Sequence, residues 1–267
     1  MARRAVEALV AVAAGAGDED GRVLLERLRA AARELADSRP GVGAVEGAVG
    51  RLLAAVNQGS HLPLPELHRL LEEEARALID GRDRAAASIA IQLAPRLTDA
   101  FVLTHSASAT VREALLHTPP AGVVCTVSEP GGEGRAFAAE LEEAGLKVEL
   151  VEDAEAAKAL EYASLLLLGA DTVFRDGTLC NKLGTRALAE AADAAGASTV
   201  VACEVIKLAP FEPTELRGEA AAVFDLTPPE LVDQVVTEEG TYESDGVRSL
   251  IDRTPFLAEG YRLLRGD

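Results

Sequence analysis

The chain has 267 residues, of which 48% are hydrophobic and only 3% aromatic, so its core must be built mainly from Ala, Val and Leu. That composition suits helices packed on a parallel sheet, in one large domain or in a small domain joined to a medium one. Because 44 acidic residues outnumber 26 basic ones, the formal net charge is −18, which excludes a broad basic surface for DNA or RNA.

The first hundred residues have a helical pattern. Glu7 interrupts the short apolar run at the N-terminus, which favours an amphipathic helix over a signal peptide. Apolar residues then repeat at helical spacing, and Pro or Gly residues such as Gly81 separate the segments. We expect a helical domain over residues 1–97. Its main helices are predicted at Arg22–Ala36, at Val42–Val56, in the segment opened by Pro63 and Pro65, and at Asp83–Leu97.

From residue 98 onward, short apolar runs alternate with helical patterns, which predicts a mainly parallel, Rossmann-like sheet with helices on both faces over residues 98–267. The predicted strands are Ala100–Leu103, Val123–Val127, Val148–Val151, Leu165–Leu168, Thr199–Cys203 and Ala222–Leu226. The predicted helices between them are Ser108–His117, Arg135–Glu143, Ala154–Tyr162 and Lys182–Ala195.

Ligands of such sheets bind at the carboxyl ends of the strands, so we sought the chemistry in the loops that follow them. Hydroxyls and free amides at a helix start can hold a phosphate, although helix capping by Ser106 or Ser108 would also explain them. An arginine after a Gly-rich turn could pair with phosphate or lie on the surface. The candidate ligand-binding residues are Thr104, His105, Ser106, Arg135, Asp171, Asp176, Asn181, Lys182, Glu204 and Lys207.

The remaining composition describes the surroundings of the chain. Only four of the basic residues are lysines, and acid excess with Arg in place of Lys predicts a halophilic, archaeal-like protein, with acidic drift in a GC-rich mesophile as the alternative. Three separated cysteines without a CxxC motif indicate neither a disulfide framework nor a metal site, and they fit the cytoplasm. No stretch is long and apolar enough for a membrane span, and we expect no cofactor.

The stretch 169–185, GADTVFRDGTLCNKLGT, followed by a helix and VVACEVIKLAP, resembles the signature of the initiation factor 2B alpha/beta/delta subunit-related family. Further matches are VLTHSASATVREAL, EGRAFAAELEEAGLKVELVEDA and PPELVDQVVTEEG, so the resemblance runs from about Arg22 to Gly240. That family also contains methylthioribose-1-phosphate isomerase and ribose-1,5-bisphosphate isomerase. The resemblance implies a helical N-terminal domain on a Rossmann-like domain, and a homodimer formed through the latter.

Departures from the isomerases bear on the function. In the isomerases that the chain resembles, a cysteine stands at the position of Ser106 and a catalytic aspartate at that of Thr178. A serine hydroxyl is a far poorer acid than a thiol, and threonine has no carboxylate for acid–base work. Asp176 and Cys180 lie nearby, but their side chains start from other places in the loop. At residues 130–131 the chain has Pro-Gly, where the isomerases often have an Arg–Pro pair that grips phosphate.

Three hypotheses follow from this pattern. The one we prefer from the sequence is a non-catalytic protein like an initiation factor 2B subunit, which binds a phosphorylated sugar or nucleotide in a regulatory role and engages a protein partner in translation. The second is an aldose–ketose isomerase of sugar phosphates, which uses Asp176 with Ser106 or Cys180. In the third, the sheet only forms a dimer face and the loops have lost their ligand.

Overall fold

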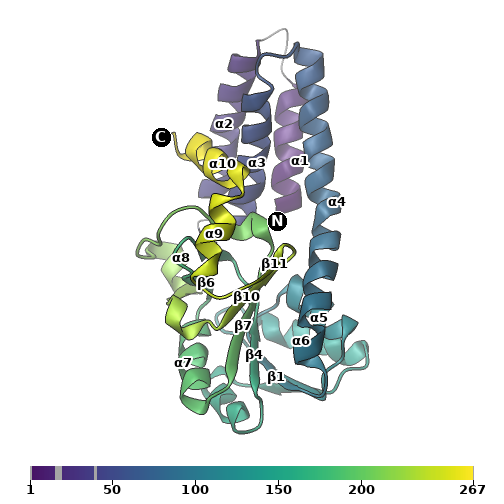
Figure 1. The fold of residues 1–267 in the computed structure, drawn as a ribbon, viewed down its shortest axis with the longest axis vertical. Coiled ribbons are helices and arrows are strands. Elements are labelled where there is room, and N and C mark those ends of the chain that lie inside the picture. The colour runs from purple at the N-terminus through teal and green to yellow at the C-terminus, as the bar shows by residue number, and fades with distance from the viewer. Residues whose placement is uncertain (1, 16–19, 39–40, 267) are drawn as a thin grey trace.

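The computed structural model describes residues 2–15, 20–38 and 41–266. Helices come first in the chain, and they stand as a bundle above the sheet (Figure 1). Leu24, Leu53 and Leu67, from three different helices, are fully or almost fully buried together in the core of this bundle. The helices are α1 (Ala2–Ala14), α2 (Gly21–Asp37), α3 (Gly43–Gln58) and α4 (Leu64–Leu97).

Helix α4 runs without a break from the bundle down the side of the sheet (Figure 1), so the predicted separation at Gly81 is wrong. A glycine inside a helix costs only about 1 kcal/mol relative to alanine. Packing offsets that cost, because Leu71 is buried in the bundle on one side of Gly81 and Leu93 is buried against the sheet on the other.

The main sheet has seven strands in the order β11-β10-β7-β4-β1-β2-β3, and all neighbours are parallel except β10 and β11. This confirms the predicted fold class. In chain order the strands are β1 (Phe101–Thr104), β2 (Gly122–Thr126), β3 (Val148–Val151), β4 (Leu165–Leu168), β7 (Ser198–Ala202), β10 (Gln234–Thr237) and β11 (Gly240–Tyr242).

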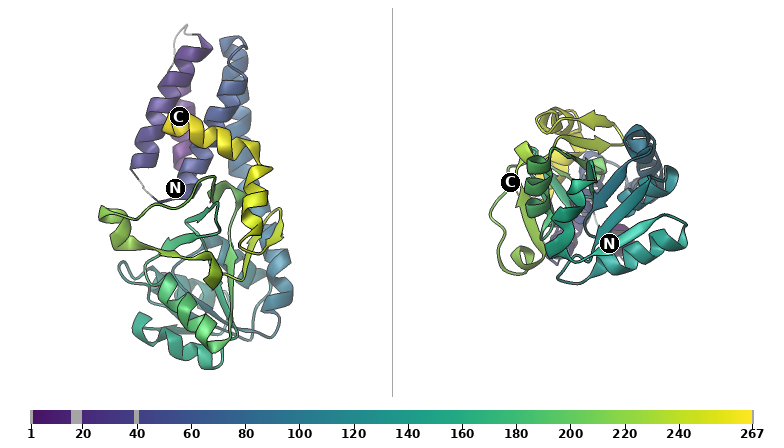
Figure 2. Two further views of the ribbon diagram at one scale, coloured as in Figure 1. Left: turned by 60° about the vertical axis from the view of Figure 1, so that its left-hand side comes forward. Right: turned by 90° about the horizontal axis from the view of Figure 1, so that it is seen from below.

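Both faces of the sheet are covered by helices (Figure 2). Successive side chains of each strand point to opposite faces, so a strand with a continuous apolar run needs helices on both of them. Leu165 and Leu167 pack with the lower half of α4, with α5 (Ala109–His117) and with α6 (Glu133–Glu143). Leu166 and Leu168 pack with the 3₁₀ segment η1 (Asp153–Glu161) and with α7 (Thr185–Ala195). The predicted helix at 154–162 is therefore a 3₁₀ helix, and α7 begins three residues after Lys182.

A second sheet of four strands was not predicted, and it carries part of the signature stretch. Residue Lys182, expected in a helix, ends β6 of this sheet. The predicted strand at 222–226 exists as β9, but it pairs with β6 and not with the main sheet. The order is β8 (Leu208–Ala209), β5 (Thr172–Phe174), β6 (Leu179–Lys182) and β9 (Phe224–Thr227), with α8 (Gly218–Val223) before β9.

The last helices return to the bundle. After the 3₁₀ turn η3 (Pro229–Leu231) and α9 (Gly246–Asp252), α10 (Pro255–Arg265) buries Leu263 and Leu264 among the bundle helices. Helices α3 and α10 cross where Gly50 faces Gly260, and a Cβ added to Gly260 would lie 2.5 Å from the Gly50 carbonyl carbon. The helical layer is thus built from both ends of the chain, and the predicted division at residue 97 stays a prediction. No helix among the described residues is long and apolar enough to cross a membrane.

Candidate functional site

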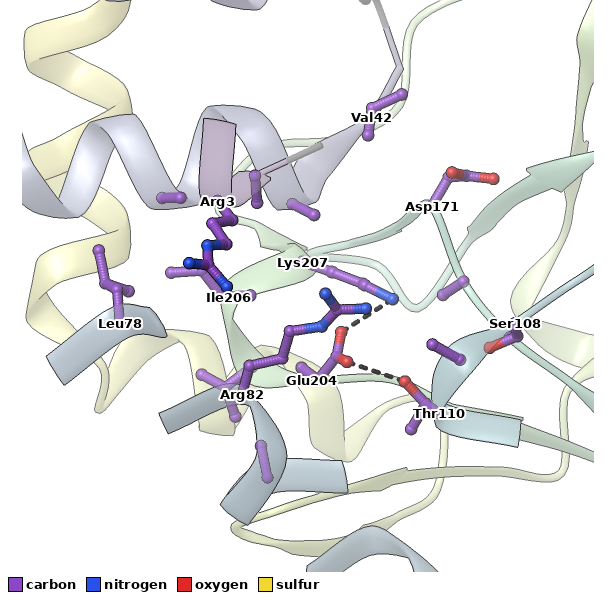
Figure 3. Close-up of a pocket in the computed structure, with 18 of the residues that line it drawn as sticks. Arg3, Val42, Leu78, Arg82, Ser108, Thr110, Asp171, Glu204, Ile206 and Lys207 are labelled. Atoms are coloured by element: carbon purple, nitrogen blue, oxygen red, sulfur yellow. Dashed lines mark hydrogen bonds and ion pairs between the residues drawn. The ribbon is translucent and has the colours of Figure 1, made fainter. Parts of the chain in front are cut away.

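A cavity of about 1250 Å³ lies where the carboxyl ends of the strands face the helical bundle (Figure 3). Its walls come from strand-end loops, from the 3₁₀ turn η2 (Val205–Lys207) and from α1, α3 and α4. Most of the predicted ligand-binding residues line it. These are His105, Ser106, Asp171, Asn181, Lys182, Glu204 and Lys207.

His105 anchors the loop after β1. Its Nε2 donates a hydrogen bond to the Leu183 carbonyl oxygen at 2.9 Å, so its Nδ1 accepts one from the Thr126 hydroxyl at 2.7 Å. The Thr126 hydroxyl is in turn 2.7 Å from that of Ser128. Burial lowers the pKa of His105, which keeps the ring neutral at pH 7. The ring therefore ties together three strand-end loops and is held by both nitrogens.

Ser106 has a strained backbone and a fixed hydroxyl. Its φ of +66° lies in the left-handed region, which costs a non-glycine residue on the order of 1–2 kcal/mol. The strain is held because its backbone N–H donates to Ser128 Oγ at 2.7 Å and its own hydroxyl donates to Glu133 Oε1 at 2.7 Å. The hydroxyl thus points toward the first turn of α6.

Glu133 connects Ser106 to Lys182. The Lys182 ammonium lies 3.0 Å from the Glu133 carboxylate and also donates to the Pro130 carbonyl. Although burial opposes its charge, hydrogen bonds from Ser106 and Lys182 hold the pKa of Glu133 below its usual value. The pair is ionised, and it places a cation in the cavity wall beside Ser106.

Asp171 offers a carboxylate of a different kind. No hydrogen bond to its carboxylate oxygens is found within the described part of the chain, and the side chain lines the cavity. Burial raises its pKa to about 6, against the opposing charge of Lys207. Its backbone is fixed from the bundle, because the Gly43 N–H donates to the Asp171 carbonyl at 3.0 Å and to Thr172 Oγ1 at 2.9 Å. A carboxylate near pKa 6 can give and take protons at neutral pH.

Glu204 and Lys207 form a buried ion pair on the cavity floor, 2.8 Å apart (Figure 3). The Thr110 hydroxyl donates to Glu204 Oε1 at 2.8 Å, from the start of α5. Burial opposes both charges, yet the partners overcome it: the pKa of Glu204 is lowered and that of Lys207 is raised. Both groups are therefore charged at neutral pH.

The predicted residues that do not line the cavity have structural partners. Thr104 is buried within β1. Arg135 is exposed on α6 and pairs with Glu152 at 3.3 Å, as its surface alternative requires. Asp176 closes the β5–β6 turn, where its carboxylate accepts from the Thr178 N–H at 2.9 Å and from the Thr178 hydroxyl at 2.8 Å.

This placement changes how the departures from the isomerases are interpreted. Thr178 and Cys180 are not among the residues that line the cavity. The Cys180 thiol is fully buried, and burial raises its pKa to about 12, which makes it inert as an acid or a nucleophile. The missing carboxylate at position 178 therefore does not remove acid–base chemistry from the cavity, because Asp171 supplies a carboxylate there. The serine at position 106 does change the chemistry of the cavity, because Ser106 lines it.

Several site residues were not predicted from the sequence. Glu133 follows glycines that adopt positive φ, and an acidic residue in the first helical turn after Gly-Gly is a signal that we could have used. Thr110 and Arg82 lie on helices, and only the packing of α5 and α4 brings them to the cavity. The α5 start is capped by Ser108, whose side chain accepts from the Val111 N–H, so the capping explanation holds there.

The fold and the cavity together define a class of protein. Its members have a helical layer over a mainly parallel sheet, with a charged cavity at the carboxyl ends of the strands. Among the described residues, no group of three side chains could hold a metal ion. The chain belongs to the Initiation factor 2 subunit family, whose model matches residues 1–220. The resemblance read from the signature stretch is thereby confirmed.

Members of that family with different names are similar to this chain. A ribose 1,5-bisphosphate isomerase of Haloferax volcanii is 29% identical over 92% of this chain and 84% of its own length. A putative translation initiation factor eIF-2B subunit 2-like protein of Pyrococcus abyssi is 27% identical over 90% of this chain and 88% of its own. The eIF2B-beta2-delta2 complex of C. thermophilum shares the fold, with a TM-score of 0.82 at 21% identity over 94% of this chain and 87% of the matched chain.

Proposed function

We propose that the chain binds a phosphorylated sugar in the cavity and interconverts its aldose and ketose forms, with Asp171 as the acid–base group. The observation that carries the proposal is the Asp171 carboxylate, which faces the cavity without a hydrogen-bond partner among the described residues and has a pKa of about 6. The similarity to ribose 1,5-bisphosphate isomerases supports it, and it favours our second hypothesis over the one we preferred from the sequence.

The chemistry needs one base and a nearby cation. In an aldose phosphorylated at C1, the bond from C1 to the ring oxygen O4 breaks as O4 takes up a proton. The hydrogen of C2 then moves to C1 with its electron pair, and the C2 hydroxyl loses its proton as C2 becomes the ketone carbon. Asp171 can give a proton to O4 and take one from the C2 hydroxyl in turn, since its pKa of about 6 lets both its protonated and its ionised form exist near neutral pH. The charges of Lys207 and Lys182 both act on Asp171, so they also favour negative charge on the sugar oxygens as the C2 hydroxyl loses its proton.

The ligand's phosphate would lie against the loop from Ser106 to Thr110. This loop joins backbone N–H groups at the start of α5 to hydroxyls, and Lys182 lies on the adjoining wall. Such a combination suits an anion, and it accounts for the rare lysines at the strand ends.

The test is the conversion of ribose 1,5-bisphosphate to the ketose by the purified chain, with Asp171→Asn as the first variant. We expect that variant to lose about 10²–10⁴-fold in kcat while its affinity for the sugar phosphate changes little. The matched control is Asp176→Asn, because that carboxylate is engaged in a turn outside the cavity. Full activity of Asp171→Asn, or loss only in the control, would refute the assignment.

A second candidate function rests on Ser106. Its hydroxyl replaces the thiol of the isomerases that the chain resembles, and it donates to Glu133, whose lowered pKa makes that carboxylate a weak base for activating a hydroxyl. A cavity without that thiol would bind a phosphorylated sugar or nucleotide and signal to a protein partner, as in our first hypothesis. Binding of ribose 1,5-bisphosphate or AMP in calorimetry, with no turnover of the sugar, would select this candidate.

We also propose a cytoplasmic homodimer adapted to high salt. The support is the family resemblance for the dimer, and the acid excess with few lysines for the salt adaptation. Light scattering during size-exclusion chromatography in low and high KCl tests both points, and a monomer under both conditions contradicts the dimer.

A further inference from the structure

The cavity walls hold both signs of charge, and most of the cations there are already neutralised. Lys182 lies 3.0 Å from Glu133, and Lys207 lies 2.8 Å from Glu204. At the rim, Arg3 lies 2.8 Å from Glu7. A phosphate that enters the cavity therefore meets cations whose charge is largely balanced, so further positive charge is needed for strong binding.

Arg82 supplies that charge from the helical bundle. It comes from the middle of α4, and its guanidinium points into the cavity beside Glu204 (Figure 3). Within the part of the chain that the structure describes, it makes no hydrogen bond or ion pair. Glu204 is therefore flanked by two cations, since Lys207 contacts it directly and the charge of Arg82 also acts on it.

The position of Arg82 separates it from the acid–base group. Figure 3 shows the Lys207 side chain between Asp171 and Arg82, which come from a strand-end loop and from α4. If the sugar carbons C1 and C2 lie at Asp171, the opposite end of an extended sugar lies on the Arg82 side. A guanidinium presents a planar set of donors that matches a phosphate in two hydrogen bonds at once.

We propose that Arg82 is a specificity-determining residue, which binds the phosphate at the end of the sugar distant from the reacting carbons. The chain then prefers a sugar with a phosphate at each end over one phosphorylated only at C1. This inference rests on the proposed function, because it assumes that the sugar's reacting end lies at Asp171. It adds a residue of the helical bundle to a site otherwise built from strand-end loops.

The experiment compares the binding of ribose 1,5-bisphosphate and ribose 1-phosphate by isothermal titration calorimetry. Arg82→Gln should weaken the bisphosphate by about tenfold or more and leave ribose 1-phosphate within about twofold, so that the preference between them collapses. Arg82→Lys should recover part of it. Arg84→Gln is the matched control, since Arg84 is exposed on the same helix as Arg82 is, but does not line the cavity.

The outcomes separate this inference from the proposed function. An unchanged preference in Arg82→Gln, or an equal loss in Arg84→Gln, overturns the role of Arg82 while sugar-phosphate binding stands. Equal affinity of the unaltered chain for the two sugars would also overturn the role of Arg82 and leave sugar-phosphate binding standing. Binding of neither sugar by the unaltered chain overturns the inference and the proposed function together.

Discussion

The buried ion pair on the cavity floor allows a stability prediction that does not depend on any ligand. The Glu204 side chain is 8% exposed and that of Lys207 16%, so neither charge is well hydrated. Lys207→Met keeps an unbranched side chain, one atom shorter, and removes its charge, which leaves the Glu204 carboxylate with the Thr110 hydroxyl as its direct partner. Breaking a buried pair on one side costs about 3–5 kcal/mol. We expect about 3 kcal/mol, since Lys207 retains some contact with solvent.

The assay is equilibrium unfolding in urea at pH 7, with a double-variant cycle. Glu204→Gln combined with Lys207→Met removes both charges of the buried pair, so the double variant should be more stable than Lys207→Met alone. Additive losses in the two single variants would refute the reasoning, because they would show that the charges do not depend on each other. So would a loss below about 0.5 kcal/mol in Lys207→Met.

The pH dependence of that prediction follows from the sign of the shift. The pKa of Glu204 is lowered in the folded chain, because Lys207 overcomes the cost of burial. A lowered carboxyl pKa contributes stability that is present above the unfolded pKa and is lost as the pH falls through the folded pKa. In Lys207→Met the carboxyl takes up a proton more readily, so the difference from the unaltered chain should shrink as the pH is lowered from 7 toward 4.

Three further predictions concern the cavity and its supports. The pKa of Asp171 is raised to about 6, so ionisation of its carboxyl group lowers the stability of the folded chain as the pH rises. In thermal unfolding, Asp171→Asn should stabilise the chain at pH 8 by on the order of 1–2 kcal/mol, and by less toward pH 4. Gly47→Ala should destabilise α3 by about 1–3 kcal/mol, because its Cβ would lie 1.9 Å from the Ile206 carbonyl oxygen. Gly81→Ala should instead stabilise α4 by about 0.5–1 kcal/mol in urea unfolding, because its Cβ would lie 3.9 Å from Arg84 Nη2, an ordinary contact. Ser106→Cys should raise isomerase turnover about tenfold or more, and unchanged turnover would speak against a role for an acidic group there.

The sequence was most informative where burial imposes a continuous apolar run. The strand at 165–168 was predicted with the bounds that the structure has, because it is a fully buried run of four leucines in the middle of the sheet. The strand at 148–151 was also predicted with its bounds, although it lies at the edge of the sheet and is only partly buried. The missed strands β5, β6, β8, β10 and β11 are only two to four residues long, and β6 contains Asn181 and Lys182. Short mixed strands have no period that a sequence can reveal, since their pairing comes from neighbours far away in the chain.

The site shows the same division between local and distant causes. Parallel strands end at one edge, so loop residues such as Ser106 and Lys207 could be assigned to one place before any coordinates were known. Arg135 also follows a strand, but the first turn of α6 directs its side chain toward Glu152 and presents Glu133 to the cavity. The strand order predicts at which edge of the sheet the cavity lies. The rotation of each helix that follows a strand decides which side chain faces the cavity.

The helical bundle contributes to the cavity in a way that no motif records. The Gly43 N–H at the start of α3 holds the Asp171 backbone, and Gly47 lets α3 approach the Ile206 carbonyl more closely than any side chain would allow. Helix α4, uninterrupted at Gly81, carries Arg82 to the opposite wall. A change in the tilt of α3 therefore moves Asp171, and a change in the tilt of α4 moves Arg82. Because the two helices and α10 share one buried core, binding in the cavity and packing in the bundle must be thermodynamically linked.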